Sequence, residues 1–263
     1  MKRYHLFEFE DQTWFPDVLR RNMLDYLRFA ITLTRVYEPV VPLLQRILPP
    51  GRPVKILDLC SGGGGGIIGI HKSLTAALQQ PVQITLSDKF PNLPAFAWIA
   101  NQTQGAIGYE ANAVDATDVP ARFTDTRTVF SAFHHFKPGQ ARAILADAAR
   151  KRVPIGIFEG AGKSYGEIAA AILLFPPIFL LVTPFIRPFR FSRLFFTYLV
   201  PLIPLCTIWD GCISILRLYT PEHLRKLTAG IPSDGYTWEA GKINHKTGTV
   251  IYLIGYPANQ QPL

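Results

Sequence analysis

The stretch VKILDLCSGGGGGIIGI, residues 54–70, decides the fold of this chain. Its apolar start, residues 54–59, predicts a buried strand that runs into five consecutive glycines, Gly62–Gly66, and then into an amphipathic helix to about Gln79. Glycines let a backbone approach a ligand closely, and the first turn of a helix offers free N–H groups. Because open α/β sheets bind ligands at the carboxyl ends of their strands, this loop predicts a ligand site.

Strands and helices alternate beyond this stretch. The expected positions are residues 82–87, 106–113, 127–132 and 154–158 for strands, and 93–101 and 138–150 for helices. Residues 236–244 and 249–256 are also strand-like, and their short connection permits only antiparallel pairing. The sequence therefore predicts an α/β fold with a doubly wound, mostly parallel seven-stranded sheet that ends in an antiparallel hairpin.

The composition indicates an apolar protein. Of 263 residues, 48% are hydrophobic and 17% are charged, which is below the roughly 25% charged residues of an average soluble domain. The net charge is +8, but the basic residues are scattered, so we expect no nucleic-acid partner. Cys60, Cys206 and Cys212 form no CxxC pair or zinc-type Cys/His spacing, so no metal site is expected.

The amino-terminal sequence contains acidic residues where a signal peptide needs an apolar run. Together with the three scattered thiols, this predicts a cytoplasmic protein, free or bound to the cytoplasmic face of a membrane. We expect four parts. They are a helical lead-in (1–50, its first helix capped by Asp11 or Thr13), a core (51–163), an apolar insertion (164–220), and a last helix with the terminal hairpin (221–263).

The loop resembles the first motif of class I S-adenosylmethionine-dependent methyltransferases, which have a Rossmann-like fold. In that family an acidic residue precedes alternating glycines; here Asp58 is the acid, Cys60 replaces the first glycine, and Gly62 and Gly64 fill the next two places. The resemblance implies that Asp58 supports the loop and the methionine ammonium of the cofactor. It also implies that Ser61 lies in the loop that binds it.

Two later carboxylates fit the same resemblance. Asp88 follows the second strand, where a carboxylate can accept both ribose hydroxyls. Asp115 follows the third strand, where the family binds the adenine amino group, with the backbone N–H of Ala116 on the ring. Each acid alone could instead be a turn residue or a helix cap.

The fourth strand runs into Ser131-Ala132-Phe133-His134-His135. In the resembled family this segment lies under the cofactor, which implies that Ser131, Phe133 and His134 are neighbours of the sulfonium. An aromatic face there would attract the positive charge, although ordinary core packing is an equal alternative for Phe133. His134 or His135 is the candidate general base, and either could instead make a structural hydrogen bond.

The insertion has an unusual composition, because residues 168–186 and 194–209 carry no charge. The five prolines of these uncharged stretches, Pro176, Pro177, Pro184, Pro201 and Pro204, argue against two straight membrane-spanning helices. We expect a kinked helical hairpin that meets one leaflet of a membrane through residues 168–209. Arg187, Arg190 and Arg193 would meet head groups, and Tyr198 and Trp209 would lie at the interface. The alternatives are a soluble lid or dimer interface, and a true span.

The resulting hypothesis is an S-adenosylmethionine-dependent methyltransferase with an apolar or lipid-like small-molecule acceptor. Asp210 could line its substrate side or serve only as a local cap. A non-catalytic membrane-associated scaffold and a nicotinamide-dependent oxidoreductase remain as rivals. The acid before the glycines, Asp115 and the terminal hairpin favour the methyl donor over a dinucleotide.

Overall fold

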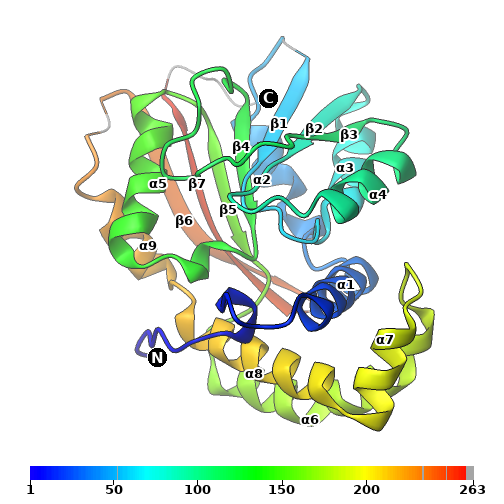
Figure 1. Cartoon of the computed structure of the whole chain (residues 1–263). Helices are drawn as coiled ribbons and strands as arrows, with labels where there is room; N and C mark the ends of the chain where they lie inside the picture. Colours follow the sequence, from blue (N-terminus) through cyan, green and yellow to red (C-terminus); the bar gives the residue numbers. More distant parts are fainter. Residues whose placement is uncertain (52, 233, 247, 259–263) are drawn as a thin grey trace.

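A computed structural model describes residues 1–51, 53–232, 234–246 and 248–258 (Figure 1). Seven strands form one sheet in the order β3-β2-β1-β4-β5-β7-β6. The first five are parallel, and β7 pairs antiparallel with both β5 and β6. The strands are β1 (Val54–Asp58), β2 (Val82–Leu86), β3 (Ile107–Tyr109), β4 (Thr126–Phe130), β5 (Ile155–Glu159), β6 (Tyr236–His245) and β7 (Gly248–Pro257). The predicted fold class is confirmed.

Helices cover both faces of the sheet, and their apolar faces form two core clusters (Figure 1). Residues of α5 (Pro138–Arg150) and α9 (Pro221–Thr228) belong to one cluster. Residues of α2 (Val41–Ile47), α3 (Ile67–Leu78) and α4 (Leu93–Gln102) belong to the other. Because neighbouring parallel strands end at the same edge, the residues that follow β1, β2 and β3 share one side of the sheet.

The lead-in begins with a 3-10 turn, η1 (Phe9–Asp11), and its helix α1 spans Asp17–Thr34. The predicted cap at Asp11 or Thr13 is therefore wrong. Pro16 occupies the N-cap without a side-chain hydrogen bond, and Asp11 ends η1 instead. A further 3-10 turn, η2 (Glu38–Val40), leads into α2, and β3 is shorter than expected.

The insertion is helical, as the composition indicated. It comprises α6 (Tyr165–Val182), η4 (Thr183–Phe185), α7 (Phe191–Leu194), the π-turn η5 (Phe195–Leu199) and α8 (Leu202–Arg217). Helices α6 and α8 lie together on the side of α1 that faces away from the sheet (Figure 1). Tyr26 of α1 stacks on Phe179 of α6, with ring centroids 3.7 Å apart, so α1 joins the insertion to the domain.

Residues 165–185 form one helical stretch that is long and apolar enough to cross a membrane, with a mean hydropathy of 2.3 and 17% of it buried. The stretch formed by α7 and η5 (residues 191–199) is bent by 82° relative to α8 at a short break, so the two form no straight span. Of the three arginines expected to meet head groups, two pair with an acid of α1 instead. Arg193 is buried and pairs with Asp25 of α1 at 2.5 Å, and Arg190 pairs with the same carboxylate at 2.9 Å.

Candidate functional site

The glycine loop after β1 has a positive φ at four positions. Cys60, Gly62, Gly64 and Gly65 have φ of 56°, 51°, 81° and 31°, a region that a residue with a Cβ adopts at a cost. Cys60 thus adopts the conformation expected of the glycine it replaces. A Cβ on Gly64 would lie 2.0 Å from Cδ1 of Ile99 in α4, so a larger residue there would displace that buried side chain.

Asp58 supports this loop from inside the protein. Its carboxylate accepts from Oγ of Ser61 and from Oγ1 of Thr128 in β4, each at 2.7 Å. Burial raises the pKa of Asp58 to about 7. Ser61 N donates to the backbone oxygen of Ser87 at the end of β2, which fixes the loop to the neighbouring strand. The implied support of the loop is visible here, and the contact of Asp58 with a ligand ammonium stays a prediction.

Asp88 lies beside the loop, where the strand-end pattern placed it. Its two carboxylate oxygens accept from the backbone N–H groups of Gly62 and Phe90, each at 2.9 Å. Burial is the main cause that raises the pKa of Asp88. Each carboxylate oxygen can accept more than one hydrogen bond, so both remain able to accept from a diol.

Asp115 is also a turn residue, since its Oδ1 accepts from the backbone N–H and hydroxyl of Thr117. Its Oδ2 accepts from Lys89 at 2.8 Å, and the hydrogen bond from Lys89 is the main cause that lowers the pKa of Asp115 to about 2. This bond joins the end of β2 to the segment after β3. Ala116 is buried directly after the acid.

Phe90 was not anticipated from the sequence. Phe90 is 81% exposed and lies two residues after Asp88, beyond the end of β2. An exposed aromatic beside these carboxylates offers a flat apolar face to a planar ring. Its position shortly after Asp88, the acid that follows β2, is the sequence signal that could have identified Phe90 as a site residue.

The segment after β4 is largely buried. Ser131 has φ of 49°, and its hydroxyl bonds to that of Tyr37, a residue that sequence reasoning missed. Phe133 is buried in the core and packs against Tyr219, with centroids 5.6 Å apart. Core packing therefore describes Phe133 in this structure, and its contact with a sulfonium stays a prediction.

His134 is held by Glu159, the last residue of β5. Glu159 accepts from the backbone N–H of His134 at 2.8 Å and pairs with its Nδ1 at 2.9 Å. If Nδ1 carries the proton that Glu159 accepts, Nε2 is the basic nitrogen of the ring. Glu159 could have been found by extending the strand-end rule to the fifth strand.

His135 meets the amino-terminal segment. Its Nδ1 lies 2.9 Å from Asp11, and Arg217 of α8 donates to the same carboxylate at 2.6 Å. Burial opposes the charged form of His135, but its hydrogen bond with Asp11 and the charge of Glu8 raise its pKa overall. Burial likewise raises the pKa of Glu8 to about 8.

Glu8, His134 and His135 each offer a ligand atom within 4.8 Å of the others, so this group could hold a metal ion. The sequence spacing gave no sign of it, because Glu8 lies more than 120 residues from the histidines. Arg217 approaches Glu8 to 3.1 Å, and its positive charge disfavours a cation there. We therefore interpret the group as an acid–base cluster beneath the amino-terminal segment.

The candidate site thus comprises the glycine loop, Asp88 and Asp115, with the histidine cluster after β4 close enough for His135 to lower the pKa of Asp88. Asp210 is not part of it: its two carboxylate oxygens accept from the backbone N–H groups of Phe9 and Glu10, at 2.7 and 3.1 Å. The local-cap alternative for Asp210 is the one that the structure shows.

No family model matches the chain, and no curated protein matches it in sequence. Solved structures do share its fold. The plantazolicin methyltransferase BpumL, solved in complex with SAH, is 12% identical over 94% of both chains, with a TM-score of 0.57. The mitomycin 7-O-methyltransferase MmcR is 14% identical over 96% of this chain and 61% of its own, with a TM-score of 0.53. The pyocyanin biosynthetic protein PhzM is 12% identical over 86% of this chain and 56% of its own, with a TM-score of 0.50. The chain therefore has the Rossmann-like α/β fold found in these methyltransferase structures.

Proposed function

We propose that this protein is an S-adenosylmethionine-dependent methyltransferase whose acceptor is an apolar or membrane-associated small molecule. The observation that carries the proposal is the convergence of the left-handed glycine loop, Asp88 and Asp115 at the carboxyl ends of β1, β2 and β3. The likeness in fold to BpumL, which was solved with SAH, supports the same cofactor.

Each part of the crevice has a chemical task in this proposal. Asp88 would accept from the ribose hydroxyls, since both of its oxygens keep acceptor capacity. Asp115 would accept from the adenine amino group, and the exposed ring of Phe90 would cover the base. Asp58, Cys60, Ser61, Gly62 and Gly64 would shape the loop around the methionine part, with Ala116, Ser131 and Phe133 lining the remainder.

The cofactor, when bound, supplies an activated methyl group, so the protein's task is to position the acceptor and exclude water. If the acceptor is a hydroxyl, its proton needs a base. We propose His134 as that base, because Glu159 orients its ring and its buried Nε2, 3.9 Å from Glu8, has no hydrogen-bond partner among the described residues. His135, paired with Asp11 and facing Arg217, is the weaker candidate.

The acceptor class follows from the surface of the insertion. Nine large apolar side chains of the insertion are more than half exposed: Ile172, Leu173, Leu174, Leu180, Leu181, Phe185, Phe191, Leu199 and Leu205. Soluble monomers rarely expose a contiguous apolar patch of this kind. We propose that this face meets one leaflet of a membrane and that the acceptor comes from there.

Contact with one leaflet fits the packing better than a span does. One face of α8 is buried, and its Asp210 caps the amino-terminal turn. The insertion therefore lies along the domain, and α6 carries five of the nine apolar residues that are more than half exposed. Arg187 is exposed and remains the insertion arginine that can meet a head group.

The direct test is transfer of a radiolabelled methyl group from S-adenosylmethionine into an organic extract of membranes. The wild-type protein should label an extractable product, and Asp88→Asn should label little. His134→Ala should lower the rate by about 100-fold or more if the acceptor is a hydroxyl. Labelling that appears only in the aqueous phase would contradict an apolar acceptor, and no labelling with any extract would contradict the activity.

A further inference from the structure

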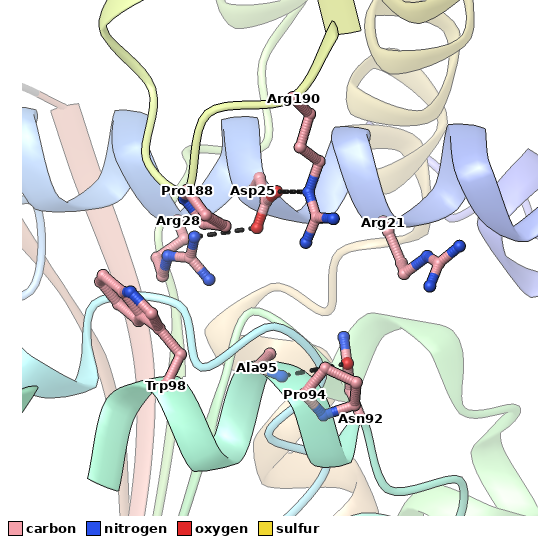
Figure 2. Close-up of a pocket in the computed structure, with 9 residues that line it drawn as sticks. All are labelled: Arg21, Asp25, Arg28, Asn92, Pro94, Ala95, Trp98, Pro188 and Arg190. Carbon is pink, nitrogen blue, oxygen red and sulfur yellow. Dashed lines mark hydrogen bonds and ion pairs between the residues drawn. The ribbon is translucent and has the colours of Figure 1, made fainter. Parts of the chain in front are cut away.

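A small polar cavity lies between α1 and the beginning of α4, close to the glycine loop (Figure 2). Arg21, Asp25 and Arg28 of α1 form one wall. Asn92, Pro94, Ala95 and Trp98 form the opposite wall, and Pro188 and Arg190 enter from the insertion. The cavity thus joins three parts of the chain that are distant in sequence.

The charge around this cavity is strongly positive. Among the nine lining residues, Asp25 is the one acid, against Arg21, Arg28 and Arg190. Asp25 accepts from Arg28 at 2.8 Å and from Arg190 at 2.9 Å, and also from the buried Arg193 at 2.5 Å. One carboxylate therefore faces three guanidinium groups, and Arg21 adds a fourth positive charge one turn earlier on α1. An anion that binds in the cavity would offset this excess of positive charge.

Contacts with neighbouring residues position the side chains of Arg28 and Arg21. The guanidinium of Arg28 lies 4.6 Å from the ring centre of Trp98 and donates to the backbone oxygen of Gly63 at 3.3 Å. The latter bond places the cavity directly beside the glycine loop. Arg21 donates through Nε to the backbone oxygen of Asp17 at 3.3 Å, so its terminal nitrogens have no hydrogen bond to another described residue.

The space is too small for a nucleoside. About 20 Å³ is open to the centres of water-sized atoms, which is room for one or two such atoms. Guanidinium groups bind carboxylates and phosphates through paired hydrogen bonds. The oxygen atoms of a carboxylate or phosphate are about the size of water, so one or two of them would fill this space.

We propose that this cavity binds the oxyanion group, a carboxylate or phosphate, of an amphipathic acceptor whose apolar part lies along the insertion. This inference rests on the proposed function and narrows its acceptor to an acidic amphiphile. Arg190 and Pro188 belong to the same segment as the exposed Phe189 and Phe191, so polar and apolar recognition adjoin there. The bond between Arg28 and Gly63 would keep the acceptor close to the loop that holds the methyl donor.

Three probes test the proposal by calorimetry on the full chain: decyl phosphate, decanol and inorganic phosphate. We expect decyl phosphate to bind at least about tenfold more tightly than either of the others, which corresponds to about 1.4 kcal/mol. Arg190→Gln and Arg21→Gln should each remove most of that advantage. Arg35→Gln, at the exposed end of the same helix α1, removes one charge outside the cavity and should leave it intact. Arg190→Gln should fold, since Asp25 keeps Arg28 and Arg193.

Equal binding of decyl phosphate and decanol would overturn the proposal, as would equal binding of decyl phosphate and inorganic phosphate. The cofactor's own carboxylate is the competing occupant. If Arg190→Gln and Arg21→Gln weaken S-adenosylhomocysteine but not 5′-methylthioadenosine, which lacks that carboxylate, the cavity belongs to the cofactor and the proposal fails. Should decyl phosphate bind as expected while S-adenosylhomocysteine does not bind at all, the proposed methyltransferase function fails and the oxyanion site stands.

Discussion

Single residues determine the shape of the glycine loop and the polarity of the crevice around it. Asp58, Asp88 and Asp115 follow successive strands, and their positions could be predicted because strand ends are readable in the sequence. Their partners could not be predicted: Lys89 pairs with Asp115, and Gly62 donates to Asp88, through loop geometry that has no sequence pattern. Glu8 was missed because its contacts with the histidines depend on the path of the whole amino-terminal segment.

Gly64→Ala tests the loop geometry. The new Cβ would meet Ile99 at 2.0 Å, and φ of 81° disfavours any L residue. We expect the free energy of unfolding to fall by about 2–4 kcal/mol, from backbone strain and overpacking together. Gly69→Ala is the matched control, because Gly69 lies in α3 with open space around it, and alanine should stabilise that helix by about 0.5–1 kcal/mol. Similar results for both variants in urea titrations would contradict the loop geometry.

Asp88→Asn tests the proposed ribose contact. The amide keeps one acceptor oxygen but loses the charge and the second acceptor, so affinity for S-adenosylhomocysteine should fall about tenfold or more. Thermophoresis with purified protein provides the measurement. Asp118→Asn, whose carboxylate is 82% exposed beside Lys151, changes the same charge elsewhere and should bind like the wild type. Unchanged affinity of Asp88→Asn would remove Asp88 from the site.

At the scale of elements, the periodic patterns predicted the core well. The helix at 138–150 was predicted with its observed bounds, and each strand was placed within a few residues. The start of α1 was mispredicted. Asp11 and Thr13 were expected to cap the helix, but the helix begins later, at Asp17, with Pro16 as its N-cap. The orientation of the insertion arginines was also mispredicted, since Asp25, far away in sequence, binds two of them.

The amino-terminal turn is bound to α8 through Asp210, and this contact should depend on pH. Burial raises the pKa of Asp210 from 3.8 to about 6, with Glu10 and Asp11 nearby adding to the rise. The folded state therefore binds this proton more tightly than the unfolded chain. This tighter proton binding by Asp210 stabilises the folded state fully below pH 4, and the stabilisation is lost as the pH rises through 6.

Asp210→Asn removes this titration. The stability of the wild type relative to the variant should fall by on the order of 2 kcal/mol between pH 4 and pH 7. Urea titrations at several pH values measure the difference. A constant or rising difference over that range would show that Asp210 is charged throughout in the folded protein.

For the whole molecule, the exposed apolar face is the feature that composition predicted most clearly, while its partner cannot be read from hydropathy. Leu173 and Leu181 are 72% and 71% exposed on α6. Replacing both with Glu should lower binding to phosphatidylcholine and phosphatidylglycerol vesicles at least about tenfold, because charge replaces buried apolar area. Leu33→Glu, equally exposed on α1 but outside the insertion, should change vesicle flotation little. If all variants float like the wild type, this face does not meet the membrane.

A crystal structure of the protein with S-adenosylhomocysteine tests the central claim most directly. The account predicts the adenosyl group at the carboxyl ends of β1, β2 and β3, with the ribose hydroxyls on Asp88 and the adenine amino group on Asp115. Density for the ligand elsewhere, or a saturating soak that leaves both carboxylates without ligand contact, would contradict it.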